Sequence, residues 1–299
     1  MKNVQLVLLG FLTLSVFMTS SHAQTWVEDS YEDFADGRLD ASGQNIYVSR
    51  SGSIRTIHRF DINQDGFIDL IFNSTHDSYA FIPPSVGTIT KDRKIQRSEL
   101  AVEGSRCVEI ADLNRDGWLD LVIPQMFVDR SFILWGGVEG FSMERLQLLS
   151  VLNGTSASAA DLTGNGYLDL ILGGHRTPPT GPPESFVYIY WNGPDGLRED
   201  NRTLLPAKAA RGFAIADFDK NGLLDIFTCS YDGGRGERDV DSYLYWNRPV
   251  RGFSATDVKR LFTHSAAGSI GADFNQDGWI DLAIANHKIW GDHIGHSAV

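Results

Sequence analysis

The sequence predicts an all-β protein made of repeated four-stranded antiparallel sheets. Three observations carry this prediction: an Asp-rich loop that occurs five times, a short apolar strand on either side of each loop, and a Trp that ends a further strand in three of the repeats. The loops begin at Asp61, Asp112, Asp161, Asp217 and Asp273, so their starts are separated by 51, 49, 56 and 56 residues. A spacing this regular indicates one supersecondary unit copied along the chain.

The first two strands of each unit flank the loop. The first is expected directly before the loop, at 54–60, 107–111, 156–160, 213–216 and 269–272. The second begins inside the end of the loop and is expected at 67–72, 118–123, 167–172, 223–227 and 279–284. These runs are rich in β-branched and aromatic residues and are bounded by Gly and polar turns, which favours strands over helices.

A third and a fourth strand complete the unit. The third ends at Trp135, Trp191 and Trp246, which are 56 and 55 residues apart and therefore keep the period of the loops. A Gly-Phe or Gly-Leu pair then leads into a fourth strand such as 144–149. Four short antiparallel strands in about 50 residues is the size of one blade of a β-propeller. The Trp residues are expected to pack between neighbouring blades rather than to stack on a sugar.

The predicted propeller occupies residues 44–299. The strand at 45–49 precedes the first inner strand and could complete the last blade, which otherwise stops near Trp290 after three strands. That pairing would close a five-bladed ring, and part of a seven-bladed ring is the alternative. Residues 24–43 would then pack as an irregular N-terminal extension.

The first 23 residues have the pattern of a secretory signal peptide. Lys2 is followed by an apolar run over 4–17 and by the small-residue ending at Ala23, after which cleavage is expected. A membrane anchor is the alternative, but the apolar run is short for a span. The mature chain is therefore expected to be secreted, periplasmic or bound at the cell surface, with no transmembrane segment after signal removal.

Charge and cysteine content exclude other classes of function. The formal net charge is -12, and nucleic acid is not an expected partner because phosphate binding needs a basic surface. The five loops together hold 14 side-chain carboxylates, which accounts for much of the acidity. Cys107 and Cys229 occupy different positions within different repeats, so they are expected to be buried free thiols without a catalytic role.

The loops are predicted to bind calcium. Ligands at positions 1, 3, 5, 7 and 9 of a tight loop point inward when a Gly at position 6 permits a sharp turn, and hard oxygen ligands favour calcium. Position 7 contributes its backbone carbonyl and the other positions their side chains. The predicted ligands, for up to five structural Ca²⁺ ions, are Asp61, Asn63, Asp65, Phe67 and Asp69; Asp112, Asn114, Asp116, Trp118 and Asp120; Asp161, Thr163, Asn165, Tyr167 and Asp169; Asp217, Asp219, Asn221, Leu223 and Asp225; and Asp273, Asn275, Asp277, Trp279 and Asp281.

An EF-hand is one alternative to this loop. An EF-hand needs a bidentate Glu at position 12 and flanking helices, but position 12 holds Phe72, Ile123, Leu172, Thr228 and Ile284. The other alternative is that Asp and Asn merely form turns. The loop that starts at Asp161 carries only two carboxylates and is expected to be the weakest site.

The order of strand, Asp-x-Asn-x-Asp-Gly-x-x-Asp-Leu loop, strand and Trp-Gly-x-x-x-Gly-Phe resembles the FG-GAP or VCBS repeat. That repeat is the blade of the integrin α-subunit propeller and of many exported bacterial proteins. The resemblance covers about four-fifths of the chain and implies that the loop residues are calcium ligands. Family members are commonly seven-bladed, and the same blade serves adhesion receptors, lectins and some polysaccharide lyases. The resemblance therefore implies a fold more than a function.

A ligand is expected at the end of the sheets opposite the loops, where the second and third strands connect. Residues 14 or 15 positions after each first Asp gather there, and their neighbours add charge. The candidate ligand-binding residues are His76, Asp77, His175, Arg176, Tyr231, Asp232 and His287, with Met126 and Arg235 nearby. Such groups suit a polar or sugar ligand, and an ordinary solvated surface is the alternative.

No catalytic motif stands out in the sequence. Gly-x-Ser-x-Gly, His-Glu-x-x-His and phosphate-cradling glycine loops are absent, and the carboxylates belong almost entirely to the loops. The leading interpretation is an exported calcium-binding propeller that binds an extracellular glycan or protein ligand without catalysis. A polysaccharide lyase or glycosidase on the same scaffold is the alternative.

Overall fold

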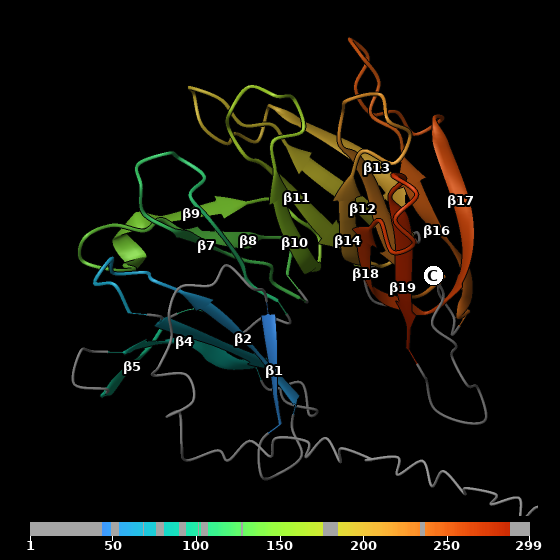
Figure 1. Cartoon of the computed structure of the whole chain (residues 1–299). Coiled ribbons are helices and arrows are strands. Elements are labelled where there is room, and N and C mark those ends of the chain that lie inside the picture. Colours follow the sequence, from blue (N-terminus) through green and yellow to red (C-terminus); the bar gives the residue numbers. More distant parts are fainter. Residues whose placement is uncertain are drawn as a thin grey trace, which may run out of the picture.

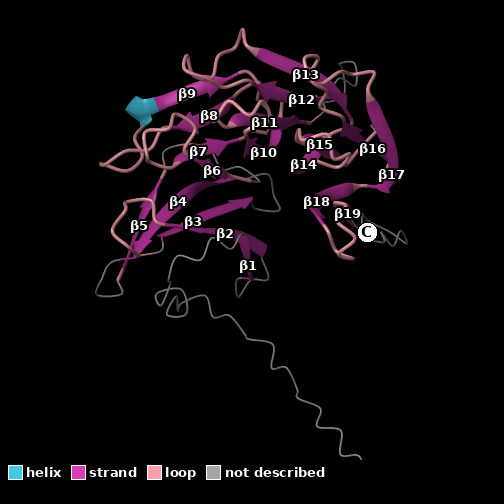
Figure 2. Ribbon diagram, turned by 45° about the horizontal axis from the view of Figure 1, so that its top comes forward, coloured by secondary structure: helices cyan, strands magenta, loops and turns pink. Residues whose placement is uncertain are grey.

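A computed structural model describes residues 44–48, 54–67, 69–75, 81–89, 94–100, 102, 107–126, 128–175, 185–233 and 237–287. These residues form antiparallel sheets that follow one another round an arc (Figures 1 and 2). The expected signal peptide 1–23 and extension 24–43 lie outside them. Within the described part, the one helix is a short 3-10 turn, η1 (Met143–Arg145), and no helix is long and apolar enough to cross a membrane.

Each sheet holds one unit of the repeat. The first contains β1 (Gln44–Val48), β2 (Ile54–Phe60), β3 (Asp69–Thr75), β4 (Phe81–Ile89) and β5 (Ile95–Glu99), and the second contains β6 (Glu109–Ala111), β7 (Asp120–Ile123), β8 (Ser131–Leu134) and β9 (Leu146–Leu149). The third contains β10 (Gly154–Ala160), β11 (Asp169–Gly174), β12 (Ser185–Tyr190) and β13 (Arg202–Ala207). The fourth contains β14 (Ala210–Ala216), β15 (Asp225–Ser230), β16 (Asp239–Tyr245) and β17 (Val258–His264), and the last contains β18 (Ala266–Ala272) and β19 (Asp281–Asn286).

The strand order confirms the predicted unit, and the boundaries differ by a few residues. The second strand begins at the ninth loop residue, two residues later than expected, because the N–H of position 7 still bonds within the loop. In every sheet this ninth Asp lies opposite the last residue of the first strand, as Asp169 does opposite Ala160. The third strands end just before Trp135, Trp191 and Trp246.

The expectation that the strand at 45–49 could complete the last blade is wrong. β1 pairs antiparallel with β2, with Gln44 opposite His58 and Val48 opposite Ile54. Only five residues separate these two strands in the sequence, and a connection that short favours neighbours in one sheet. The first sheet thereby gains a fifth strand, and β18 and β19 are the strands of the last sheet that the structure describes.

Hydrophobic cores lie between consecutive sheets, because the middle strands are buried on both faces. In β11, Leu170 and Leu172 pack in the core shared with the second sheet, whereas Ile171 packs in the core shared with the fourth. Alternate residues of a strand point to opposite faces, so a continuous apolar run serves two cores. Trp135, Trp191 and Trp246 pack against these inter-sheet cores, which confirms their expected place between blades.

The first strands of consecutive sheets approach one another closely. β6 contacts β10, β10 contacts β14, and β14 contacts β18, as expected for the inner strands of an arc. Their close approach requires small residues. A Cβ atom added to Gly212 on β14 would lie 3.2 Å from the carbonyl oxygen of Ala267 on β18.

The two cysteines are free, as expected from the sequence. Cys229 is buried within β15, whereas Cys107 is half-buried and precedes β6 instead of lying within it. Burial raises the pKa of the Cys107 thiol to about 12 and that of Cys229 to about 11. Both groups are therefore neutral thiols near pH 7.

Glu109 places a carboxyl group between two inner strands. Its Oε1 accepts a hydrogen bond from the Ala159 N–H at 3.1 Å, so β6 is tied to β10. Burial raises the pKa of this carboxyl from 4.5 to about 7, and the hydrogen bond limits the rise. Between these two pH values the folded chain holds a proton that the unfolded chain has released, so Glu109 makes stability fall as pH rises.

We expect Glu109→Gln to stabilise the protein at pH 8 and to change little at pH 4. The neutral amide can still accept the Ala159 N–H and does not become charged when buried. The gain at pH 8 should be about 1–3 kcal/mol in unfolding free energy. Denaturant unfolding of parent and variant at both pH values measures it, and an equal difference at the two values would contradict the role of ionisation.

Candidate functional site

The five Asp-rich loops fold in the same way around their first residue. One carboxylate oxygen of the first Asp accepts the N–H of position 5, and the other oxygen accepts the N–H of position 6, at 2.7–3.1 Å in all five loops. The Gly at position 6 has φ between 83° and 88°, a region that other residues rarely adopt. The first Asp therefore closes the turn that the Gly permits.

The side chain at position 5 holds the second half of the turn. Its Oδ1 accepts the N–H of position 7 at 2.7–2.9 Å in every loop, whether the residue is Asp or Asn. In the first, second and fifth loops, the Asn at position 3 also donates its side-chain N–H to the Asp at position 5. The oxygen-bearing side chains at positions 1, 3 and 5 are thus gathered on the inside of one turn.

The ninth residue, always Asp, joins the loop to the rest of its sheet. Its Oδ2 accepts the N–H of position 2 at 2.8–3.1 Å in all five loops. In the second, third and fourth loops its Oδ1 also accepts, at 2.8 Å, the N–H of the residue after the Trp that follows the third strand. One carboxylate therefore ties the start of the loop to the end of the third strand.

These ninth-position carboxylates are buried where a further sheet follows. Asp69, Asp120, Asp169 and Asp225 have no exposed surface, whereas Asp281 in the last sheet is half-buried. Burial raises the pKa of Asp120, Asp169 and Asp225 to about 6, and the backbone N–H donors limit the rise. The neighbouring loop carboxylates add to the rise. A divalent cation would relieve this repulsion.

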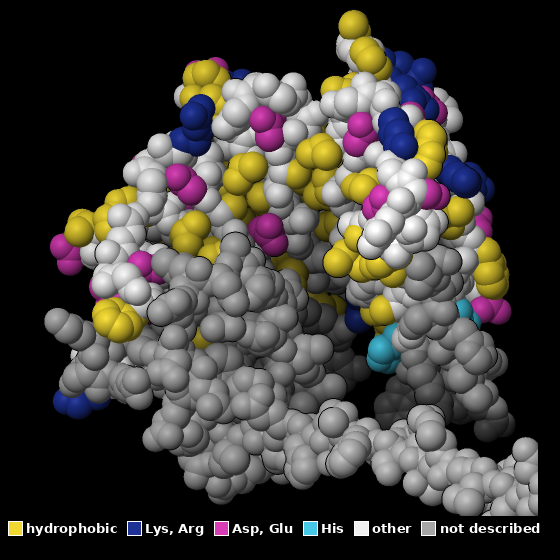
Figure 3. All heavy atoms as spheres, viewed as in Figure 1, with side chains coloured by type: hydrophobic (Ala, Val, Ile, Leu, Met, Phe, Trp, Pro, Cys, Tyr) yellow, Lys and Arg dark blue, Asp and Glu magenta, His cyan; other side chains and the backbone are white. Residues whose placement is uncertain are grey.

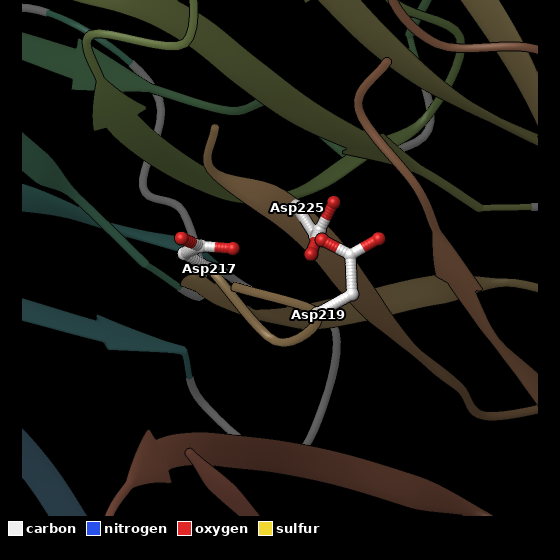
Figure 4. Close-up of side chains that lie close together, drawn as sticks. All are labelled: Asp217, Asp219 and Asp225. Carbon is white, nitrogen blue, oxygen red and sulfur yellow. The ribbon is translucent and has the colours of Figure 1, made fainter. Parts of the chain in front are cut away.

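The fourth loop gathers its carboxylates most closely among the described residues. Asp217, Asp219 and Asp225 each place an oxygen within 4.8 Å of the others, and their side chains converge in Figure 4. Three carboxylates with further oxygen groups nearby match the hard ligand set of Ca²⁺. Arg248 also pairs with Asp219, and its Nε lies 2.9 Å from Asp257 Oδ2. The residues of this loop thus fit a divalent cation.

The third loop carries only two carboxylates and keeps the common turn. Thr163 is exposed, and Asn165 donates its side-chain N–H to the carbonyl of Asn192 at 2.9 Å. Asn221 makes the corresponding bond to Asn247 in the fourth loop. The third loop keeps the common turn with fewer charges. That it binds calcium most weakly of the five loops stays a prediction.

The opposite end of the sheets brings together several of the predicted ligand-binding residues. Tyr231 follows β15 and His287 follows β19, and their rings lie 5.7 Å apart between centroids, with the hydroxyl 3.5 Å from the imidazole Nδ1. Asp232 lies beside Tyr231 and forms an ion pair with Arg238 at 3.3 Å. His175 holds the equivalent position after β11, where its N–H donates to Asn153. His76, Asp77, Arg176 and Arg235 lie outside the described residues.

Two arginines near Tyr231 were missed by the sequence reasoning. The guanidinium of Arg211 lies 3.6 Å from the centre of the Tyr231 ring, and that of Arg238 lies 5.3 Å from it. Arg211 lies at the start of β14, six residues before Asp217. This distance along an inner strand places it at the end of the sheet opposite the loop, and could have identified it as a candidate ligand-binding residue. Figure 3 shows a Lys or Arg side chain and a His side chain close together at the lower edge of the described part of the molecule.

Comparison with known proteins identifies the repeat. Residues 61–123 and 161–228 match the FG-GAP-like repeat, and each matched segment contains two of the Asp-rich loops. The chain contains FG-GAP-like repeats. Their presence together with the four-stranded antiparallel sheets agrees with the predicted integrin-α-like β-propeller.

The chain is also similar to part of an integrin α subunit. The chain is 32% identical over 142 residues to integrin alpha-6 of Gallus gallus. The aligned segment covers 40% of this chain and 12% of the integrin. The chain thus matches about an eighth of the length of that relative.

We expect Asp169→Ala to lower the unfolding free energy by about 2–4 kcal/mol even in EGTA. The substitution leaves the N–H groups of Leu162 and Asn192 without their acceptor in a buried place. Thr163→Ala, in an exposed position of the same loop, is the matched control and should cost less than about 0.5 kcal/mol. Urea unfolding in EGTA measures both. Equal stability of Asp169→Ala and its parent in EGTA would show that the carboxylate acts through a metal alone.

Proposed function

We propose that the protein is an exported calcium-binding module that holds an extracellular carbohydrate or protein ligand at the end of the sheets opposite the Asp-rich loops. The observation that carries this proposal is the meeting of Tyr231 and His287 from neighbouring sheets at that end, beside two arginines. The FG-GAP-like repeats and the similarity to an integrin α subunit support an extracellular setting. An N-terminal signal peptide cleaved after Ala23 fits the same proposal.

Calcium has a structural role in this proposal. The first, third, fifth and ninth side chains and the seventh carbonyl would hold one ion in each loop, up to five in all. The close approach of Asp217, Asp219 and Asp225 supports the assignment most directly. A bound ion neutralises carboxylates that otherwise repel, and so it stabilises the turn between the inner strands.

The chemistry of the ligand end favours a ligand with acidic or hydroxyl groups. Arg211 and Arg238 present guanidinium groups near one aromatic ring, and His287 is exposed beside them. Guanidinium groups bind carboxylate and sulfate through paired N–H donors, and imidazole donates to hydroxyl or anionic oxygen. An acidic polysaccharide or an acidic side chain of a protein matches this set.

One contact is compatible with the enzymatic alternative. The Tyr231 hydroxyl and His287 Nδ1, 3.5 Å apart, are groups that can transfer protons, as a lyase or glycosidase would require. The binding module is the better supported reading because the carboxylates of the described loops are engaged in turn formation. Release of unsaturated uronic acid from a polysaccharide would separate the two.

We expect EGTA to lower the melting temperature of the protein. A site filled at a hundred times its Kd contributes about 2.7 kcal/mol, which corresponds to about 5–10 °C for a domain of this size. Differential scanning calorimetry of calcium-loaded and EGTA-treated protein at the same concentration measures the change. An unchanged melting temperature would count against the calcium assignment.

We expect His287→Ala to weaken binding of an acidic polysaccharide by about tenfold, the effect of losing one hydrogen-bonding partner to an anion. Polygalacturonate and neutral dextran on an array are the probes. The control is Gln276→Ala, in an exposed position at the opposite end of the same sheet. Equal binding by His287→Ala and its parent would contradict the site, and steady product formation by the parent would favour the enzyme.

A further inference from the structure

The side chain at position 4 of one loop reaches the next loop along the chain. Gln64 donates its Nε2–H to the carbonyl of Gly117 at 2.6 Å, which joins the first loop to the second. The Arg115 guanidinium lies 4.9 Å from the centre of the Tyr167 ring, which joins the second loop to the third. The Lys220 ammonium lies 3.8 Å from the centre of the Trp279 ring, which joins the fourth loop to the fifth.

The backbone of the turn directs these side chains. Gln64, Arg115 and Lys220 have φ of 58°, 61° and 60°, in the left-handed region. Residues outside glycine adopt this conformation uncommonly, so its recurrence at one position marks a feature of the turn. These side chains also lie beside the Gly at position 6 of the receiving loop, because Arg115 and Lys220 are 3.6 Å from where a Cβ of Gly166 or Gly278 would stand, an ordinary contact distance.

One junction lacks the contact. Position 4 of the third loop is Gly164, whose φ of 70° keeps the same backbone but which has no side chain to reach the fourth loop. A Cβ added there would meet nothing within 4 Å, so packing does not require the glycine. By this position-4 contact the loops fall into a group of three and a group of two, and among the described residues the third and fourth loops are joined instead through Asn247, whose side chain donates to the Leu162 carbonyl.

Each of these contacts involves a residue of the next loop that is a predicted metal ligand or is adjacent to one. Tyr167 and Trp279 are the seventh residues of their loops, whose backbone carbonyls are predicted ligands, and Gly117 is the adjacent sixth residue. We propose that Gln64, Arg115 and Lys220 are positioning residues for the calcium site of the next loop, so that calcium binds in two coupled groups. This inference rests on the proposed calcium binding of the loops.

The coupling follows from the order of events within a group. An ion in the fourth loop fixes the turn that contains Lys220 and so presents its ammonium to Trp279. The seventh residue of the fifth loop is then already ordered, so the fifth loop loses less conformational entropy when it binds calcium. Its affinity for calcium rises. A cation–π contact at an exposed site would change this affinity by about two- to fivefold.

The positive charge of Lys220 gives the opposing effect. An ammonium near the fifth loop repels a second cation, and this repulsion alone would make calcium binding tighter when Lys220 is removed. The two effects have opposite signs. Replacing Lys220 with an uncharged side chain of similar length therefore decides which of them dominates.

The test uses terbium as a calcium substitute, excited through Trp279. The parent is Trp118→Phe, and the luminescence that remains when Asp273→Ala is added to this parent is subtracted, because Trp135, Trp191 and Trp246 lie near the other loops. We expect Lys220→Met to weaken terbium binding at the fifth loop by about two- to fivefold and Lys220→Arg to restore it. Tighter or unchanged binding in Lys220→Met would overturn the positioning role.

A second arm tests the grouping of the loops. Asp217→Ala, which impairs the fourth loop, should weaken terbium binding at the fifth loop about as much as Lys220→Met does, and should have no further effect when combined with it. Asp161→Ala, the same change in the third loop, should weaken terbium binding at the fifth loop less than Asp217→Ala does, because Gly164 sends no side chain to the fourth loop. An equal effect of both Asp variants would overturn the two groups. Absence of terbium luminescence in the parent would instead remove the calcium proposal itself.

Discussion

The interaction on which the architecture depends is the carboxylate of the ninth loop residue. In the second, third and fourth loops it accepts an N–H from the start of its loop and another from the end of the third strand of its sheet. A buried acceptor with two backbone donors is costly to remove and leaves little freedom in either segment. The Asn that follows Trp191 or Trp246 then extends this tie to the preceding sheet. Asn192 and Asn247 donate their side-chain N–H groups to the carbonyls of Leu113 and Leu162.

The same two strands of each sheet serve both ends of the molecule. β14 begins beside Arg211 and ends at the loop that starts with Asp217, and β15 returns from Asp225 to Tyr231. An ion held in the loop and a ligand held at the other end are therefore separated by the full length of the inner strands. Calcium would act on the ligand end through the order of these strands and not through contact.

The regularity of the sequence predicted the inner half of each sheet well. The spacing of the loops and the apolar runs beside them depend on local chain geometry, so β2 was predicted to the residue and the other first strands to within two or three residues of their starts. β4 and β5 were not predicted because the first unit lacks the Trp that marks the third strand elsewhere. The pairing of β1 was mispredicted because position along the chain does not determine which edge a strand joins.

The side chains that join one sheet to another were beyond the reach of motif reasoning. The residue type of Lys220 does not indicate its partner, because Trp279 belongs to the next sheet. This contact depends on how far each sheet turns relative to its neighbour, which no single repeat encodes. The five loops could be found from the sequence because all their hydrogen bonds at positions 1 and 5 are local.

The half-exposed state of Asp281 has a consequence for how the protein opens. A stack of similar units has a stability that is nearly a sum of each unit and its contacts with its neighbours. Asp69, Asp120, Asp169 and Asp225 are covered completely, and Asp281 is not. Amide hydrogen exchange would accordingly be slower in the second, third and fourth sheets, which have described neighbours on both faces, than in the β18–β19 hairpin.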